Sequence, residues 1–259
     1  MSIGTLPTLP PFLPVPSTLR IPSAPPTRRW TADEFQRMIE AGIIKENEPV
    51  ALVDGSIVYK SPRSADSPTL RHWTRAEYRR MVDIGVLQES ERVELLEGWI
   101  VQKMPRNTPH DTALDKTEES IRATLPTGWR VRSQRAVLIG ESEPEPDCAI
   151  VSGGLDAYLA NHPKPEDIGF LVEVSDSSLS TDRVIKGRLY GRASISIYWI
   201  VNLQERQIEV YAEPTGPTDP ADAAGYRVRT DYREGDTVPV VIGGQQVAKI
   251  AVASLLPRA

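Results

Sequence analysis

Two acidic residues stand inside short apolar runs, about 25 residues apart: Asp147 in EPDCAIV and Glu173 in FLVEVSD. Both runs favour β-strands. Because side chains alternate along a strand, Leu171, Glu173 and Ser175 share one face and Phe170, Val172 and Val174 the other. A carboxylate buried alone costs several kcal/mol unless it is paired, protonated or bound to a cation. Two such carboxylates on neighbouring strands would also repel each other, and one divalent cation would relieve both costs.

Simpler explanations stay open for these acids. An acidic residue in an apolar strand can face a sheet edge or pair with lysine or arginine, and a purely structural role would require a basic partner for each carboxylate. A site built from carboxylate oxygens suits Mg²⁺ or Mn²⁺ better than zinc, which prefers histidine and cysteine. A bound ion of this kind lowers the pKa of a water and stabilises charge on a phosphate.

A repeat within the chain supplies a third acidic candidate. Residues 29–62 align without a gap to residues 72–105, each copy reading as a capped helix followed by a β-hairpin. The second copy carries Glu94 in VELLEG where the first carries Ala51 in VALVDG. The framework persists without this carboxylate, so Glu94 is not needed for the fold of the unit. We therefore expect Glu94 to belong to the site.

Composition excludes several functional classes. The 259 residues carry a net charge of −5, so DNA contact would need a local basic surface or metal ions. A single cysteine, Cys148, excludes internal disulfides and a cysteine-cluster zinc site, and it is expected to be a small buried side chain. No apolar run approaches membrane-spanning length and no signal peptide is evident. We expect a cytoplasmic protein without membrane association.

The chain divides into three predicted parts. Residues 1–27 are rich in proline and read as a disordered tail, residues 28–69 as a degenerate duplicate of the helix-hairpin element, and residues 70–259 as the main domain. That domain predicts a helix over 108–125, strands around Trp129, Asp147 and Glu173, and a helix over 182–192 capped by Ser180-Thr181. A hairpin over 197–213 and further C-terminal hairpins follow. The fold class is therefore α/β (α+β), with a mixed β-sheet core flanked by helices.

The order of these motifs resembles the PD-(D/E)xK nuclease superfamily, and more narrowly the Uma2 family of restriction-endonuclease-like proteins. The resemblance spans roughly residues 72–259 and rests on VELLEGWIV, His110, EPDCAIV, LVEVSDSS, KGRLY and YWIVN. It implies a restriction-endonuclease-like fold and an enzyme that hydrolyses DNA phosphodiester bonds with Mg²⁺ or Mn²⁺. Asp147, Glu173 and Glu94 would be the metal ligands, assisted by the Val174 carbonyl.

The superfamily motif places a lysine two residues after its second acid, but this chain has Ser175 there. The Uma2 pattern is similar and takes its lysine from the next helix, which implies that Lys186 orients the attacking water. Lys186 could instead be a salt-bridge partner of Asp182, and Tyr190 is expected to pack. His110 could be a satisfied helix-start histidine or a phosphate or acid–base contact. DNA is the expected partner, a homodimer stays open, and a catalytically silent DNA-binding or protein-interaction module is the alternative function.

Overall fold

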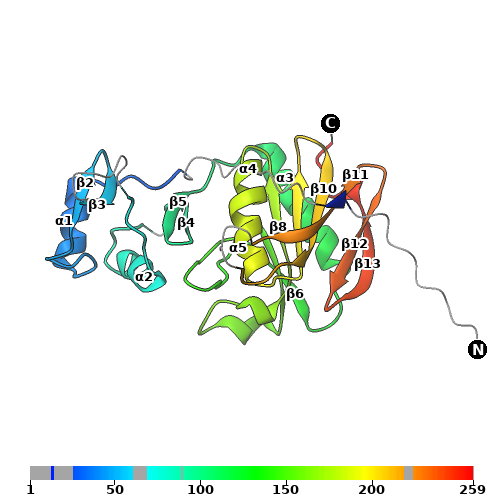
Figure 1. Ribbon diagram of the computed structural model, residues 1–259. Helices are drawn as coiled ribbons and strands as arrows, with labels where there is room; N and C mark the ends of the chain where they lie inside the picture. The colour runs from blue at the N-terminus through cyan, green and yellow to red at the C-terminus, as the bar shows by residue number, and fades with distance from the viewer. Residues whose placement is uncertain (1–12, 15–25, 61–68, 89, 219–223, 259) are drawn as a thin grey trace, which may run out of the picture.

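A mixed seven-stranded sheet forms the core of the larger part of the molecule, on the right in Figure 1, and the two repeats lie to its left. The structure, a computed structural model, describes residues 13–14, 26–60, 69–88, 90–218 and 224–258. Strands β8 and β9 run parallel, and the other neighbours are antiparallel. In spatial order the strands are β1 (Leu13–Pro14), β11 (Tyr226–Arg233), β10 (Gln207–Pro214), β9 (Ile197–Asn202), β8 (Ile168–Ser175), β7 (Cys148–Ser152) and β6 (Trp129–Ser133). The predicted α/β architecture is confirmed.

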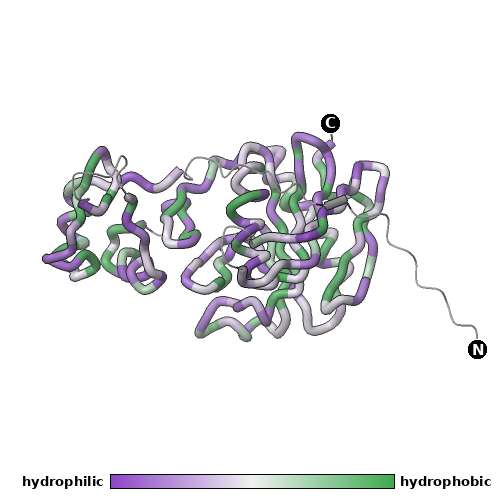
Figure 2. The backbone as a smooth tube through the Cα atoms, in the orientation of Figure 1, coloured by the Kyte–Doolittle hydropathy of each residue, from purple (hydrophilic) through white to green (hydrophobic). Residues whose placement is uncertain are grey.

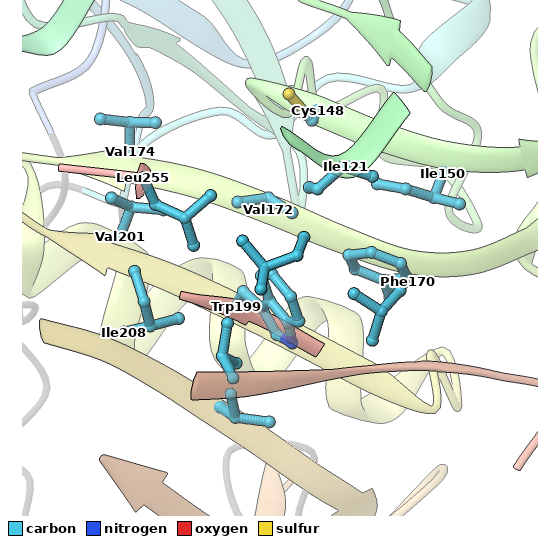
Figure 3. Close-up of a cluster of buried hydrophobic side chains, with 14 of the residues drawn as sticks. Ile121, Cys148, Ile150, Phe170, Val172, Val174, Trp199, Val201, Ile208 and Leu255 are labelled. Atoms are coloured by element: carbon cyan, nitrogen blue, oxygen red, sulfur yellow. The ribbon is translucent and has the colours of Figure 1, made fainter. Parts of the chain in front are cut away.

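One face of the sheet is packed with apolar side chains. Phe170, Val172 and Val174 of β8 point into this cluster together with Cys148 and Trp199 (Figure 3). Helix α3 (Thr108–Arg122) and the hairpin of β12 (Thr237–Ile242) and β13 (Gln245–Ala251) cover it. Helix α3 ends three residues before the predicted end, and the predicted C-terminal hairpins are confirmed. The central strands are hydrophobic while the turns around them are hydrophilic (Figure 2).

The opposite face carries Leu171 and Glu173, as strand alternation predicts. A helical segment covers it, made of α4 (Leu179–Thr181), a π-helical turn (Asp182–Lys186) and α5 (Gly187–Arg192). The predicted cap at Ser180-Thr181 is wrong: the helix begins at Leu179, after Ser178. The π turn also interrupts the α-helical hydrogen-bonding pattern of this segment. Such turns occur frequently at functional sites.

The two repeats adopt the same local structure. The first holds α1 (Ala32–Glu40), β2 (Val50–Val53) and β3 (Ser56–Tyr59), and the second holds α2 (Arg75–Asp83), β4 (Val93–Leu96) and β5 (Trp99–Gln102). Thr31 and Thr74 form matching capping boxes with Glu34 and Glu77. These units confirm the helix-then-hairpin prediction for both copies.

The repeats also exchange equivalent contacts across their interface. Arg28 pairs with Glu34 of its own copy and Glu91 of the other, at 2.7 Å each. Arg71, the counterpart of Arg28, pairs with Glu77 of its own copy and Glu48 of the other, again at 2.7 Å. The rings of Trp30 and Trp73 meet with centroids 5.7 Å apart. The two copies therefore form a pair with approximate two-fold symmetry inside one chain.

The backbone follows the same exchange. Thr27 bridges Val101 of β5, and Leu70 bridges Val58 of β3. The N–H of Gln102 donates to Pro26 O and that of Tyr59 to Thr69 O, both at 2.9 Å. Each repeat thus adds its lead-in segment to the hairpin of the other.

Most of the predicted disordered tail, residues 1–12 and 15–25, lies outside the described residues. Where the tail is described, it is paired: Leu13–Pro14 runs antiparallel to β11, and Thr27 pairs with β5. Within the described ranges, no helix is long and apolar enough to cross a membrane.

Candidate active site

All five residues predicted for the site line a single cavity of about 380 Å³. Asp147 immediately precedes β7 and Glu173 lies within the neighbouring β8, while the other residues come from the second repeat, α3 and the π turn. Residues between positions 94 and 186 of the sequence are therefore brought together around one cavity beside the sheet. The residues are Glu94, His110, Asp147, Glu173 and Lys186.

Lys186 sits among three carboxylates. Its Nζ lies 2.9 Å from Glu173 Oε1, 3.3 Å from Glu94 Oε1 and 3.8 Å from Asp182 Oδ1. The Lys186 residue is 4% exposed and Glu173 is 3% exposed, so these charges interact with little solvent screening. The Asp182 pair expected from the i,i+4 spacing exists, but it is the longest of the three contacts.

Glu94 is positioned by the hairpin of the second repeat. It lies on β4 opposite Val101, and its Oε2 accepts a 3.0 Å hydrogen bond from the Glu145 N–H. The equivalent Ala51 lies on β2 opposite Val58, in the same register. The carboxylate is thus an addition to a hairpin that forms equally well without it.

Asp147 is held on one side by the sheet and on the other by His110. Its Oδ2 accepts a 2.8 Å hydrogen bond from the Val174 N–H and lies 3.5 Å from His110 Nε2. Burial disfavours the Asp147 carboxylate, but its contacts with His110 and Val174 outweigh that cost and lower its pKa. Burial likewise disfavours the His110 cation, yet Asp147 raises the pKa of the imidazole. His110 therefore faces the acidic cluster from the first turn of α3.

Two further residues belong to this site and were not among those predicted for it. Asp182 is 2% exposed, and its Oδ2 accepts hydrogen bonds from Ser175 at 2.7 Å and Ser178 at 2.6 Å. The Tyr190 hydroxyl donates to Glu173 Oε1 at 2.9 Å, in addition to packing. Their four-residue spacing from Lys186 was the available signal, but spacing alone could not show that Asp182 lines the cavity and that Tyr190 bonds to Glu173.

A family model described as "Putative restriction endonuclease" matches residues 75–246. The chain belongs to the Uma2 family. A crystal structure of "a putative nuclease belonging to DUF820" from Anabaena variabilis resembles this Uma2 chain with a TM-score of 0.53 and 16% sequence identity. The similarity covers 70% of this chain and 96% of that one, and at this identity it shows the fold. No curated protein matches the chain.

The first repeat, residues 28–69, lies outside the segment matched by the Uma2 model, whereas the second repeat lies largely inside it. The family match therefore says nothing about any role of the first repeat in this Uma2 chain.

The Uma2 site holds more negative than positive charge. Four buried carboxylates (Glu94, Asp147, Glu173 and Asp182) surround one lysine and one histidine. Burial and the neighbouring acids together outweigh Lys186 and raise the pKa of Glu173 to about 8. Burial disfavours the Lys186 cation, but Glu173, Glu94 and Asp182 raise its pKa far above the ordinary value. A purely structural role would require an arginine or lysine facing each carboxylate; Glu94, Glu173 and Asp182 share the one lysine, and Asp147 faces His110.

The donor chemistry of this Uma2 site fits a hard cation. Its side chains present carboxylate oxygens, which Mg²⁺ and Mn²⁺ prefer, and the unbalanced negative charge favours a further positive ion. Within the described ranges, no group of three or more His, Cys, Asp and Glu side chains already stands in metal-holding geometry. Lys186 instead lies between Glu94 and Glu173.

Proposed function

We propose that this protein is a divalent-metal-dependent endonuclease that hydrolyses phosphodiester bonds of DNA. The observation that carries the proposal is the buried cluster around Lys186, in which acidic residues outnumber basic ones. Membership of the Uma2 family and the nuclease-like fold support it, because restriction-endonuclease-like proteins generally use divalent metals.

Asp147 and Glu173 would hold Mg²⁺ or Mn²⁺, with Glu94 as the third carboxylate. When bound, the ion supplies a water of lowered pKa and stabilises the additional negative charge that develops on the phosphate. The protein must then hold a water in line with the phosphorus. Lys186 is the candidate for that task, since its Nζ already lies between two of the carboxylates.

His110 has a distinct proposed role at the mouth of the same cavity. Its side chain is 12% exposed, and its Nε2 faces Asp147 while its Nδ1 is buried without a hydrogen-bond partner. Asp147 raises the pKa of the imidazole, which favours its protonated form, and a protonated imidazole can donate to a phosphate oxygen. The function therefore uses Glu94, Asp147, Glu173, Lys186 and His110 together.

Cleavage of supercoiled plasmid tests this proposal. The wild type should cleave only when Mg²⁺ or Mn²⁺ is present, while Asp147→Ala and Lys186→Ala should lose the activity. Asp115→Ala on α3 serves as a matched control, since this acid does not line the cavity. Equal cleavage by the wild type and both site variants would refute the catalytic assignment.

A catalytically silent nuclease-fold module is the second candidate. The observation in its favour is that the Lys186 ammonium already satisfies Glu94 and Glu173 without an added cation. Thermal melting separates the two candidates: a metal-dependent enzyme should be stabilised by Mn²⁺, and Asp147→Ala should remove that gain. A silent module should melt at the same temperature with and without Mn²⁺.

A further inference from the structure

Two arginines on β6 carry positive charge that lacks a carboxylate partner among the described residues. Arg130 and Arg132 lie opposite Val151 and Ala149 in the sheet, so both point to the same face. Arg132 is 9% exposed, and its Nε is buried without a hydrogen-bond partner, as are Nε and Nη2 of Arg130. A guanidinium presents five N–H donors and keeps its charge, so these buried donors call for an acceptor.

Their surroundings differ from those of the other buried arginines. Arg28 and Arg71 each contact two carboxylates. Arg132, by contrast, has its pKa lowered by burial and then by Arg130 and Arg135, both positive. The two β6 guanidiniums are gathered over one aromatic ring, with their Cζ atoms 5.4 and 5.2 Å from the centroid of Tyr158.

The arginine pair lies next to the acidic site on the same face of the sheet. Ala149, which faces Arg132, shares its side of β7 with Asp147 because side chains alternate. The N–H of Gln134 donates to Asp147 O at 3.0 Å, and Gln134 lines the cavity. Arg132 is separated from Gln134 by Ser133 alone.

We propose that Arg130 and Arg132 form a binding site for a DNA backbone phosphate that flanks the phosphate to be cleaved. A phosphate offers several strong acceptors and a negative charge, and arginine matches its geometry with paired N–H donors. The proposal rests on the proposed function for the choice of DNA as ligand. The unpartnered buried donors are independent of it.

Binding of a short DNA duplex without divalent metal tests this site separately from cleavage. Arg130→Gln and Arg132→Gln should each weaken binding about tenfold and lower the slope of log affinity against log salt by about one. Arg227→Gln removes the same charge from an exposed position of β11, far across the sheet order, and should change neither quantity. Arg132→Lys, which keeps the charge, should retain the wild-type salt slope.

Each outcome bears on the site. Equal losses in Arg132→Gln and Arg227→Gln, or no loss in either β6 variant, would overturn it. If Arg132→Gln does not fold, Arg130→Gln carries the same expectation at a less buried position. A wild type that binds DNA and never cleaves it with Mn²⁺ would remove the proposed function and leave this site in place. Stabilisation by inorganic phosphate without DNA binding would overturn the DNA assignment.

The exchange of segments between the repeats carries a second, independent inference. Pro26–Arg28 pairs with β5 through Thr27 and Val101, and Val101 pairs across to Glu94 on β4. Arg28 also holds Glu91, three residues before Glu94. Pro26 itself lines the cavity.

We infer that the first repeat is a built-in partner that positions the Glu94 hairpin. Its place is the one that a second copy of a single-repeat chain would occupy in a symmetric pair, because its ion pair and its backbone bridge with the second repeat each have a counterpart in reverse. Arg28 is then a positioning residue that acts through Glu91 and β5. The loss of the carboxylate at Ala51 left this role intact.

The symmetry of the chain supplies its own control. Arg28 and Arg71 are both 8% exposed and each stacks on a tryptophan, so their replacement by alanine should cost similar stability. Arg28→Ala should accelerate hydrogen exchange at the Gln102 amide, which bonds to Pro26, while Arg71→Ala should act on the Tyr59 amide. Stabilisation by Mn²⁺ should fall in Arg28→Ala alone.

Hydrogen exchange tests this inference independently of nuclease activity. Equal acceleration of both amides by both variants would overturn it, because the two repeats would then unfold together, with no selective effect of Arg28 on β5. Should Arg28→Ala unfold, Arg28→Lys keeps the charge but loses the two-carboxylate fork, and the same selective effect at Gln102 is expected. A wild type unaffected by Mn²⁺ would count against the proposed function, not against the exchange result.

Discussion

The Nζ of Lys186, on the π turn, lies 2.9 Å from Oε1 of Glu173, at the centre of the sheet. This ion pair joins the one lysine of the cluster to the acid whose pKa is raised to about 8. Removing either partner leaves the other buried without its ion-pair partner, so substitutions at this pair should change the stability of the fold as well as the proposed metal binding.

Lys186→Met should lower the free energy of unfolding by about 3–5 kcal/mol without metal, because it leaves Glu94, Glu173 and Asp182 uncompensated. Mn²⁺ should restore part of that loss by replacing the missing positive charge. Urea unfolding with and without Mn²⁺ measures both effects. Lys116→Met, on α3 and outside the cavity, is the control for loss of a lysine. An unchanged unfolding midpoint in Lys186→Met would contradict the structure.

Metal affinity should rise with pH. The pKa of Glu173 is raised from 4.5 to about 8, so the metal-free protein holds a proton there that a bound cation must displace. The same shift makes the folded state bind more protons than the unfolded state between these values, and metal-free stability should fall as pH rises from about 4.5 to about 8. Mn²⁺ titrations across pH 6–9 test this, and Glu173→Gln should flatten both dependences.

His110 should also contribute stability that is lost as pH rises. Because its pKa is raised in the folded state, its pairing with Asp147 stabilises the protein fully below the ordinary value of 6.5 and is lost as pH rises through the folded value. His110→Gln should therefore cost more at pH 6 than at pH 9. Thermal unfolding at the two pH values measures the difference, with His72→Gln as a control outside the cavity. A pH-independent cost would rule out the ion pair.

The sequence predicted the elements that depend on local chemistry. Thr31 and Thr74 signalled helix starts, and Gly55 and Gly98, both in the left-handed region, signalled the hairpin turns. Strand alternation correctly assigned Glu173 to the face opposite Phe170. Lys186 required the family resemblance, since nothing local shows that a lysine in a helix turns back onto a strand.

Other features could not be predicted because they arise from contacts between distant segments. The π turn shifts the helix by one residue, and hydrophobic spacing over five residues cannot reveal it. The Arg28–Glu91 pair joins residues 63 apart, and only the folded repeats bring them together. Asp182 was missed although its hydroxyl partners Ser175 and Ser178 are close in sequence, because spacing does not show that the helix start folds back onto the strand end.

Tyr190→Phe should weaken the site while leaving its packing intact. The hydroxyl donates to Glu173 at 2.9 Å, and once Glu173 is ionised such a hydrogen bond contributes about 1.5–3 kcal/mol. Without it the Glu173 carboxylate is less favoured, so the Mn²⁺ midpoint at pH 7 should shift to higher concentration and the shift should shrink above pH 9. Tyr226→Phe, whose hydroxyl bonds to the Ile195 carbonyl, removes an equally buried hydroxyl away from the acids. Identical Mn²⁺ midpoints in the two variants would argue against a role for Tyr190.

Glu94→Ala gives the second repeat the alanine that the first repeat has at the equivalent position, Ala51. The hairpin should persist, because β2 and β3 form the same register without this carboxylate. Loss of the acceptor for the Glu145 N–H costs about 1–3 kcal/mol, and relief of repulsion among the remaining acids offsets it. Because these two effects oppose each other, the unfolding free energy without metal should change by less than about 1 kcal/mol. Mn²⁺ stabilisation and plasmid cleavage should be lost.

The reciprocal change, Ala51→Glu, tests whether the position or the charge matters. The new carboxylate would occupy the equivalent register on β2, remote from Asp147 and Glu173, so Mn²⁺ stabilisation and cleavage should match the wild type. Thermal melting and plasmid cleavage on both variants complete the comparison. Full cleavage by Glu94→Ala would remove this residue from the site and leave Asp147 and Glu173 as its only proposed carboxylate ligands.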